Sequence, residues 1–263
     1  MFSRIRILLV CTVLLFTTMG YCSAANNKAD GFVTVKDGHL SRYGKRLRLW
    51  GVNFCVNVKR DGNDLELAFD RMRDAGFNGV RINLFFGTFL SEPNRTNTYD
   101  IPNTVMGSSS DMDKLDHSIL LAKQRNMIFW FSFDHPNFEP GDYNVLPDDG
   151  TKAEWCDAVK KVGGMDLIYI DSRAEAAHKA FARNILEHVN PYTGLRYADE
   201  PTIGLYEINN ENAFIENFVF GGMWKNLPQY CKNNVIKQWN EWLLKKYGSD
   251  ANLSKAWEKL LDG

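Results

Sequence analysis

Short apolar segments alternate with amphipathic helical segments along this 263-residue chain, and this alternation constrains its fold more than any other feature. Strands that each follow a helix, in regular succession, are typical of a parallel sheet covered by helices. The residues between the strands carry the 3.6-residue apolar period of helices that pack on a sheet. The predicted strands cover residues 47–56, 79–84, 127–133 and 202–209, and the predicted helices cover 63–76, 111–126 and a segment that begins at Ser172.

The residues that precede the first parallel strand predict a β-hairpin. Residues 32–35 are rich in β-branched side chains, and Asp37-Gly38 is a dipeptide typical of a two-residue hairpin turn. A second turn is predicted at Gly44-Lys45. The chain should therefore begin its folded part with a small antiparallel element.

Three further patterns concern the start of a helix, a loop and the C-terminal region. Ser172 and Glu175 have the spacing of a capping box, which predicts that Ser172 caps the helix that follows. Residues 136–150, rich in Pro, Gly and Asp, predict a loop that walls a cleft. Residues 234–263 predict two amphipathic helices. Their apolar positions are Val235, Trp239, Trp242, Leu243, Leu253, Trp257 and Leu260.

Parallel α/β chains fold as a (β/α)8 barrel or as a doubly wound sheet. The first strand is followed by Asn-Phe-Cys rather than by a glycine fingerprint, so a dinucleotide-binding fold loses its main support. A barrel places its chemistry at the C-terminal ends of its strands. We therefore predict a TIM (β/α)8-type barrel of which this chain contains about the first four βα units. The polar residues at the predicted strand ends are Asn53, Arg81, Asn83, Asp134, His135 and Asn209 to Asn212.

The segment at 206–212 reads Tyr-Glu-Ile-Asn-Asn-Glu-Asn, and three other segments accompany it in order. These are Gly-Val-Asn at 51–53, Gly-Phe-Asn-Gly-Val-Arg-Ile-Asn at 76–83 and Asn-Pro-Tyr-Thr-Gly at 190–194. Together with the strand that ends in Asp-His, they resemble the clan A retaining glycoside hydrolases, particularly the cellulases and mannanases of glycoside hydrolase family 5. The resemblance runs from about residue 31 to the C-terminus.

The resemblance implies a hydrolase that cleaves β-glycosidic bonds in poly- or oligosaccharides by double displacement, without a cofactor. Such a reaction needs one carboxyl group that protonates the leaving oxygen and a second that attacks the anomeric carbon. By resemblance, Glu211 is the general acid/base, Asn210 binds the sugar 2-hydroxyl group, Arg81 keeps the nucleophile carboxylate charged, and His135 contacts the sugar.

The second carboxylate is not evident in the chain. Glu207 lies four residues before Glu211, or about 13 Å along a strand, whereas a retaining pair lies about 5 to 5.5 Å apart. Glu207 is therefore predicted to be a buried barrel-core residue. The family's nucleophile ends the seventh strand, so the remaining half of the barrel is expected as a partner.

Two other functions stay open. A noncatalytic carbohydrate-binding half-barrel or pseudoenzyme would bind sugar without a nucleophile. A metal-dependent barrel hydrolase is weaker, because the strand ends lack clustered His and Asp ligands.

The composition of the chain bears on its ligands and on the state of its cysteines. The 31 basic and 32 acidic side chains give a net charge of −1, which supplies no basic field for nucleic acid. Aromatic residues make up 13% of the chain, and most are expected in the core, although sugar-binding clefts also use aromatic faces. Cys55, Cys156 and Cys231 predict free thiols, with one disulfide left open.

The N-terminus has the order of a secretory signal peptide. Arg4 and Arg6 precede an apolar run over residues 7–16, and small residues follow at 23–25. A stable membrane anchor would need about twenty apolar residues. We expect a signal peptide at 1–25 and a secreted or periplasmic catalytic-domain part at 26–263.

Overall fold

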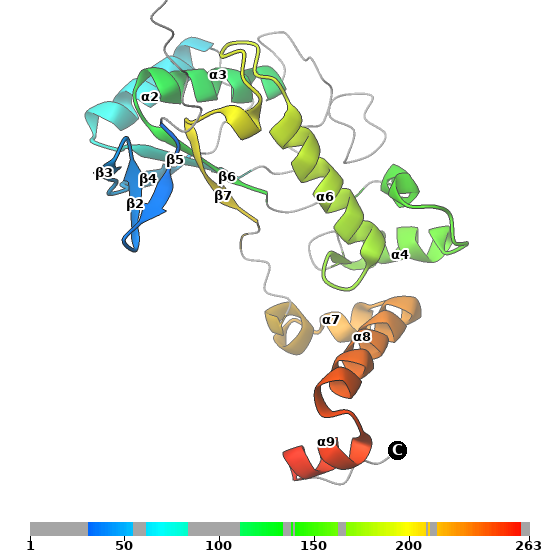
Figure 1. The fold of residues 1–263 in the computed structure, drawn as a ribbon. Coiled ribbons are helices and arrows are strands. Elements are labelled where there is room, and N and C mark those ends of the chain that lie inside the picture. Colours follow the sequence, from blue (N-terminus) through cyan, green and yellow to red (C-terminus); the bar gives the residue numbers. More distant parts are fainter. Residues whose placement is uncertain are drawn as a thin grey trace, which may run out of the picture. The chain divides into compact units, whose positions relative to one another are not determined.

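The computed structural model describes residues 31–54, 62–83, 111–133, 138, 140–162, 167–208, 210 and 215–258. The chain divides into two compact units, Met1–Leu47 and Arg48–Gly263. The expected signal peptide lies outside the described residues. Figure 1 shows the elements in their chain order.

The described part of the first unit is the predicted antiparallel element. It contains β1 (Thr34–Lys36), β2 (His39–Arg42) and β3 (Lys45–Arg46), in the order β1-β2-β3. Asp37 and Gly38 have φ values of 51° and 74°, as a turn with two left-handed residues requires. The second turn has its left-handed residues at Tyr43 and Gly44, one position earlier than predicted.

The second unit is built on a four-stranded sheet in the order β4-β5-β6-β7, and every neighbouring pair is parallel. The helices that connect these strands lie along the sheet in Figure 1. The predicted parallel α/β architecture is confirmed. The strands are β4 (Gly51–Asn53), β5 (Gly79–Asn83), β6 (Ile128–Ser132) and β7 (Ile203–Glu207), and the helices that the sequence predicted between them are α2 (Gly62–Asp74), α3 (Asp111–Gln124) and α6 (Ser172–Glu187).

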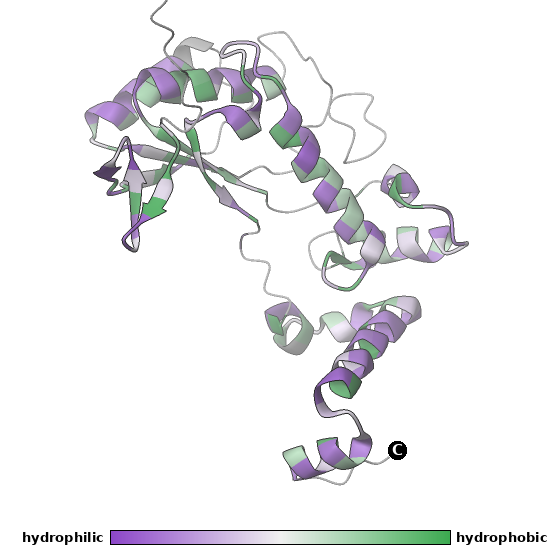
Figure 2. Ribbon diagram, viewed as in Figure 1, coloured by the Kyte–Doolittle hydropathy of each residue, from purple (hydrophilic) through white to green (hydrophobic). Residues whose placement is uncertain are grey.

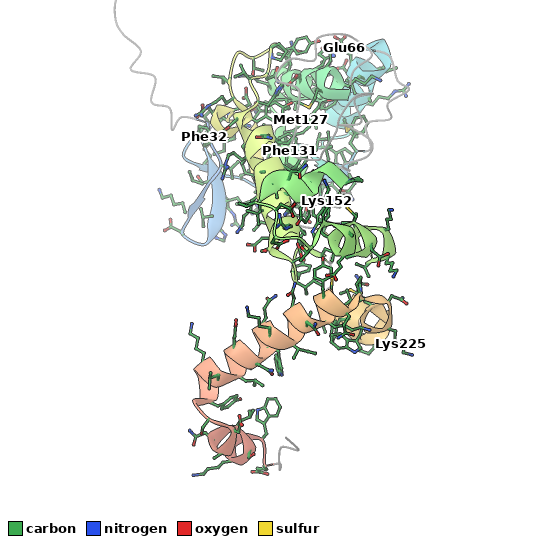
Figure 3. The ribbon with its side chains drawn as sticks, turned by 90° about the vertical axis from the view of Figure 1, so that its right-hand side faces the viewer. Phe32, Glu66, Met127, Phe131, Lys152 and Lys225 are labelled. Carbon is green, nitrogen blue, oxygen red and sulfur yellow. The ribbon has the colours of Figure 1, made fainter. Side chains whose placement is uncertain are left out.

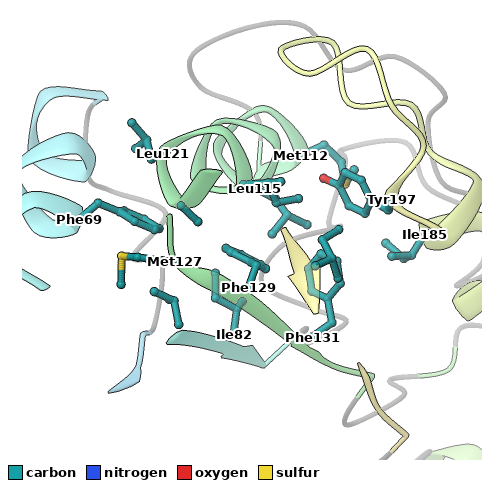
Figure 4. Packing of buried hydrophobic residues seen from close by; sticks show 14 of the residues in the cluster. Phe69, Ile82, Met112, Leu115, Leu121, Met127, Phe129, Phe131, Ile185 and Tyr197 are labelled. Atoms are coloured by element: carbon teal, nitrogen blue, oxygen red, sulfur yellow. The ribbon is translucent and has the colours of Figure 1, made fainter. Parts of the chain in front are cut away.

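One face of this sheet forms the hydrophobic core. Val80 and Ile82 of β5 and Phe129 and Phe131 of β6 are fully buried, because alternate residues of a strand point to the same side. Figure 4 shows Phe129 and Phe131 packed beneath residues of α3. Successive side chains of a strand point to opposite faces, so the residues between these buried positions face the other side of the sheet. The helix residues in the same cluster include Leu65, Phe69, Met72, Met112, Leu115, Ile119, Leu121, Phe181 and Ile185.

A buried polar network ties α3 to the chain between α6 and β7. Asp116 is fully buried, and Tyr197 Oη donates to its Oδ1 at 2.7 Å. His188 Nε2 lies 2.9 Å from the same oxygen, and Asn190 Nδ2 donates to the Asp116 carbonyl at 2.9 Å. Burial raises the pKa of Asp116, against the hydrogen bonds from His188 and Tyr197, which lower it.

Tyr197→Phe should destabilise the chain by about 1–2 kcal/mol, because the ring stays buried while Asp116 loses a hydrogen bond. Urea unfolding of the 263-residue chain measures this change. Tyr192→Phe is the matched control, since Tyr192 Oη donates to Asp113 from an exposed side chain. An unchanged free energy of unfolding for Tyr197→Phe would show that the buried hydrogen bond adds nothing.

The segment between β6 and α6 contains helices that the sequence did not predict. Within the predicted loop lies a 3-10 helix, η1 (Pro140–Val145), and α4 (Lys152–Val162) follows it. Trp155 of α4 is fully buried, with its ring centroid 6.1 Å from that of Tyr143. Arg173 donates to the carbonyl oxygens of Tyr143, Leu146 and Pro147, which holds the segment against α6.

The predicted capping box is wrong by one residue. Asp171 is the N-cap of α6, and its Oδ1 accepts hydrogen bonds from the backbone N–H groups of Arg173 and Ala174. Trp155 Nε1 also donates to Asp171 Oδ1, at 3.0 Å. A carboxylate at this position satisfies two donors of the helix and one from α4, so Ser172 becomes the first helical residue.

The C-terminal region contains α7 (Met223–Asn226), α8 (Gln229–Tyr247) and α9 (Asp250–Trp257). Helix α8 begins five residues earlier than predicted. Its first turn buries Cys231, but the predicted apolar stripe is only half covered: Trp239, Trp242 and Trp257 are 49%, 45% and 41% exposed. Figure 2 shows hydrophobic and hydrophilic residues mixed along α8 and α9.

The structure describes two of the three cysteines Cys55, Cys156 and Cys231. Cys156 and Cys231 are free thiols, and burial raises the pKa of Cys231 to about 11. Cys55 lies outside the described residues. Across the described ranges, no helix combines the length and apolar character needed to cross a bilayer.

Candidate functional site

Arg81 is the centre of the polar face of the sheet. Parallel pairing places it level with Asn53 of β4 and with Trp130 of β6. Its neighbours Val80 and Ile82 point into the core, so the Arg81 side chain points to the opposite face. This side chain is only 12% exposed, and a guanidinium so little exposed requires polar partners.

The Arg81 guanidinium contacts three side chains from two separate parts of the chain. Nε donates to Glu207 Oε2 at 2.7 Å, and Nη2 lies 2.7 Å from the same oxygen. Nη2 donates to Asn210 Oδ1 at 2.9 Å, and Nη1 donates to Asn53 Oδ1 at 3.2 Å. The Trp130 ring lies beside the guanidinium, 5.4 Å from Cζ to the ring centroid. A planar fork of donors suits this arrangement, and a lysine could not reproduce it.

The structure corrects the role predicted for Glu207. Its side chain is 23% exposed and ion-paired with Arg81, so it is a residue of the candidate site and not of a sealed core. Its position on the same face as Arg81 follows from strand alternation. The pairing itself was missed, because it depends on the register of β5, β6 and β7, which residue types do not specify.

These side chains line a hollow of about 510 Å³. Its volume falls within the range of small-molecule sites, about 300–1,000 Å³. The opposite charges of Arg81 and Glu207 compensate each other, while the two asparagine amides and the Trp130 ring supply hydrogen bonds and an apolar surface. Such a lining suits an uncharged ligand with many hydroxyl groups. The lining residues are Leu49, Gly51, Val52, Asn53, Arg81, Trp130, Glu207 and Asn210.

The structure describes two of the four predicted site residues, Arg81 and Asn210. Arg81 and Asn210, 129 positions apart in the sequence, are brought into contact. Glu211 and His135 lie outside the described residues, so their positions remain predictions. Among the described residues, Glu207 is the carboxylate that pairs with Arg81. No group of three or more His, Cys, Asp or Glu side chains within the described ranges is arranged to hold a metal ion.

No model of a known protein family matches the chain. A protein of Oryza sativa subsp. japonica, whose name assigns it to the mannan endo-1,4-beta-mannosidases, is 36% identical over 71 residues. That match covers 26% of this chain and 14% of the rice protein.

One solved structure shows the same fold over about two thirds of this chain. The endo-1,4-beta-mannanase from Rhizomucor miehei superposes with a TM-score of 0.51 at 21% identity, over 68% of this chain and 48% of that enzyme. A glycoside hydrolase family 5 mannosidase from the same organism gives a TM-score of 0.46 at 17% identity, over 78% and 58% of the two chains.

The fold is therefore that of a TIM-barrel glycoside hydrolase, matched over about half the barrel enzyme's length. The sequence match adds that a stretch of 71 residues is similar to a protein named as a mannan endo-1,4-beta-mannosidase. The chain spans about half the length of the mannanase structure and a smaller share of the rice protein.

Proposed function

We propose that this chain supplies the acid/base half of a secreted retaining glycoside hydrolase that acts on β-linked mannan. The observation that carries the proposal is the contact of Arg81 with Asn210, the residue directly before Glu211. Both residues line a hollow in which the charges of Arg81 and Glu207 compensate each other. The related proteins are named for mannan as substrate, and mannan is an uncharged polymer of hydroxyl-rich rings.

In the proposed reaction Glu211 protonates the glycosidic oxygen as the bond breaks, and later takes a proton from the attacking water. Asn210 accepts from Arg81 through Oδ1, so the donor atom of its amide is Nδ2. We assign this donor to the oxygen of the sugar 2-hydroxyl group, where a hydrogen bond strengthens as the transition state forms. Arg81 thus orients Asn210 as well as holding a carboxylate.

The nucleophile is proposed to come from a strand beyond the four in this chain. Glu207 is held by Arg81 in an ion pair, so we assign it to positioning the Arg81 side chain. Arg81 has five N–H donors, so it can contact a second carboxylate while Glu207 stays bound.

The 263-residue chain alone should hydrolyse an aryl β-mannoside no faster than its Glu211→Gln variant. Without the second carboxylate, no glycosyl-enzyme bond can form for Glu211 to assist. Release of the aryl group, followed by absorbance, measures the rate. Clear turnover that Glu211→Gln abolishes would place a nucleophile within this chain or within a second copy of it.

A noncatalytic glycan-binding function is the second candidate. It is favoured by one observation, that Arg81 already has a carboxylate partner in Glu207. Under this function, a protein that contains all eight strands would bind mannan without cleaving it. Product analysis after incubation with β-mannan separates the two functions.

The proposed export of the protein predicts where its mature chain begins. The mature protein should begin near Ala25 or Asn26, because the basic, apolar and small-residue regions of the N-terminus stand in the order that signal peptidase requires. N-terminal sequencing of the exported protein measures the start. A soluble product in the cytoplasm that retains Met1 would contradict export.

A further inference from the structure

Asn53, at the end of β4, lines the hollow but has no role in the reaction proposed above. Strand pairing places it level with Arg81, and the pairing continues one residue further, because the Phe54 N–H donates to the Arg81 carbonyl at 2.9 Å. The backbone of Asn53 is therefore held beside Arg81 from both sides of the contact. The residue is exposed, so a ligand in the hollow can reach its side chain.

The contact with Arg81 decides which way round the Asn53 amide lies. A guanidinium carries only N–H donors, so an amide that bonds to it must present its oxygen. Arg81 Nη1 donates to Asn53 Oδ1 at 3.2 Å, which leaves the NH2 group on the branch that points away from the guanidinium. Among the residues that the structure describes, none accepts a hydrogen bond from Asn53 Nδ2.

Asn210 is held in the same sense at the other terminal nitrogen. Arg81 Nη2 donates to Asn210 Oδ1 at 2.9 Å, so both amides turn their oxygens toward one guanidinium and their NH2 groups away from it. The Trp130 ring lies in the same lining. Phe131, labelled in Figure 3, is fully buried on the apolar face of the sheet, so Trp130 beside it faces the hollow.

Two fixed amide donors require oxygen acceptors in the ligand. The charges of Arg81 and Glu207 compensate each other, so the acceptors need carry no charge. A sugar chain offers hydroxyl oxygens at several positions of each ring, and the C–H face of the ring suits the indole of Trp130. Because Arg81 holds both amides before a ligand arrives, little side-chain entropy is lost when the hydrogen bonds form.

We infer that Asn53 is a further substrate-binding residue, whose Nδ2 donates to a hydroxyl oxygen of the glycan other than the 2-hydroxyl oxygen assigned to Asn210. The inference rests on the proposed function, which takes mannan as the substrate. The two atoms of the Asn53 amide then have separate tasks. Oδ1 helps to hold the Arg81 guanidinium, and Nδ2 contacts the sugar.

Titration of β-1,4-mannohexaose into the 263-residue chain, followed by calorimetry, tests the inference. Asn53→Ala removes both atoms, whereas Asn53→Asp keeps an acceptor for Arg81 and removes only the donor. Each variant should weaken binding about two- to tenfold, as the loss of one hydrogen bond does. Asn233→Ala and Asn233→Asp are matched controls. Asn233 is an exposed residue of α8 that accepts from Gln229 and does not line the hollow.

Cellohexaose in place of mannohexaose separates this inference from the proposed function. If the parent chain binds only cellohexaose and both Asn53 variants weaken that binding, mannan is the wrong substrate while the role of Asn53 stands. If Asn53→Asp binds mannohexaose as tightly as the parent while Asn210→Ala binds it less tightly, Asn53 serves only Arg81. The inference then fails although the proposed function stands. Unchanged affinity in both Asn53 variants, or no binding of either hexasaccharide by the parent chain, would also overturn the inference.

Discussion

Glu211→Ala should lower turnover of β-glycosides with poor leaving groups by about 10²- to 10⁴-fold, in a protein that unites this chain with the remaining strands of the barrel. A sugar alkoxide departs only when a proton reaches its oxygen, and Glu211 is the proposed donor. Activated aryl glycosides release a stable anion, so their first step should lose much less. Comparison of kcat/KM for mannohexaose and for a dinitrophenyl β-mannoside measures the difference.

The same variant gives a second signature. Azide should restore turnover of the activated substrate, because it attacks the glycosyl-enzyme without a general base. Glu175→Ala is a suitable control, since Glu175 is an exposed carboxylate of α6 paired with Lys179. Equal losses on both substrate classes, with no rescue by azide, would falsify the acid/base assignment.

Arg81→Ala should lower turnover of both substrate classes, by about 10²- to 10³-fold, the usual cost of removing one preorganised electrostatic group. The guanidinium is proposed to stabilise the charge of the nucleophile, and that charge is needed whatever the leaving group. The variant also removes the hydrogen bond that orients Asn210. A loss confined to poor leaving groups would contradict this role.

Arg81→Lys distinguishes charge from geometry. The three acceptors Glu207, Asn210 and Asn53 are reached from three nitrogens of one planar group. A lysine restores the charge but has one nitrogen, so it should recover only part of the loss. Recovery of full activity by Arg81→Lys would show that the fork geometry does not matter.

The strength of the ion pair between Arg81 and Glu207 can be measured in the 263-residue chain itself. A double-mutant cycle with Arg81→Ala and Glu207→Ala should give a coupling free energy within about 0.5–3 kcal/mol, the range for residues in contact. The exposed Arg73–Asp74 pair is the control and should give about 0–1 kcal/mol. A coupling no larger than that of the control would mean that the Arg81 contact is not retained in solution.

Much of the sheet could be predicted from the sequence because parallel strands carry a local signal. Residues 79–84 and 127–133 are apolar runs that follow helices, and both became strands within one or two residues of the predicted ends. The first strand was predicted at 47–56 but is described only as Gly51–Asn53. Its neighbour Leu49 lines the hollow instead of continuing the pairing.

The cap of α6 was missed for a tertiary reason, whereas α4 carries an apolar stripe at Trp155, Ala158 and Val162 that local periodicity could have predicted. Trp155 hydrogen-bonds to Asp171 from an element that the sequence did not predict, and a tertiary contact of this kind has no local pattern. The exposure of Trp239 and Trp242 was missed for the converse reason. Apolar periodicity predicts which side of a helix is apolar, but burial depends on what packs there.

The site was predictable where topology alone places residues together. Parallel strands bring their C-terminal ends to one edge, so Arg81 and Asn210 were expected in one site; their direct contact was not predicted. The partnership of Arg81 with Glu207 depends on the register of β5, β6 and β7, which residue types do not specify. The roles assigned to Glu211 and His135 remain predictions for the experiments above.

The sheet order β4-β5-β6-β7 is also the order in which the ribosome makes the strands. Each new strand pairs with the one synthesised just before it, so no strand waits for a later segment to reach its neighbour. Synthesis proceeds at about 5–20 residues per second, and the N-terminal part of a polypeptide is made first. The growing polypeptide can therefore add one βα unit at a time, and after each addition the newest strand is the template on which the next one pairs.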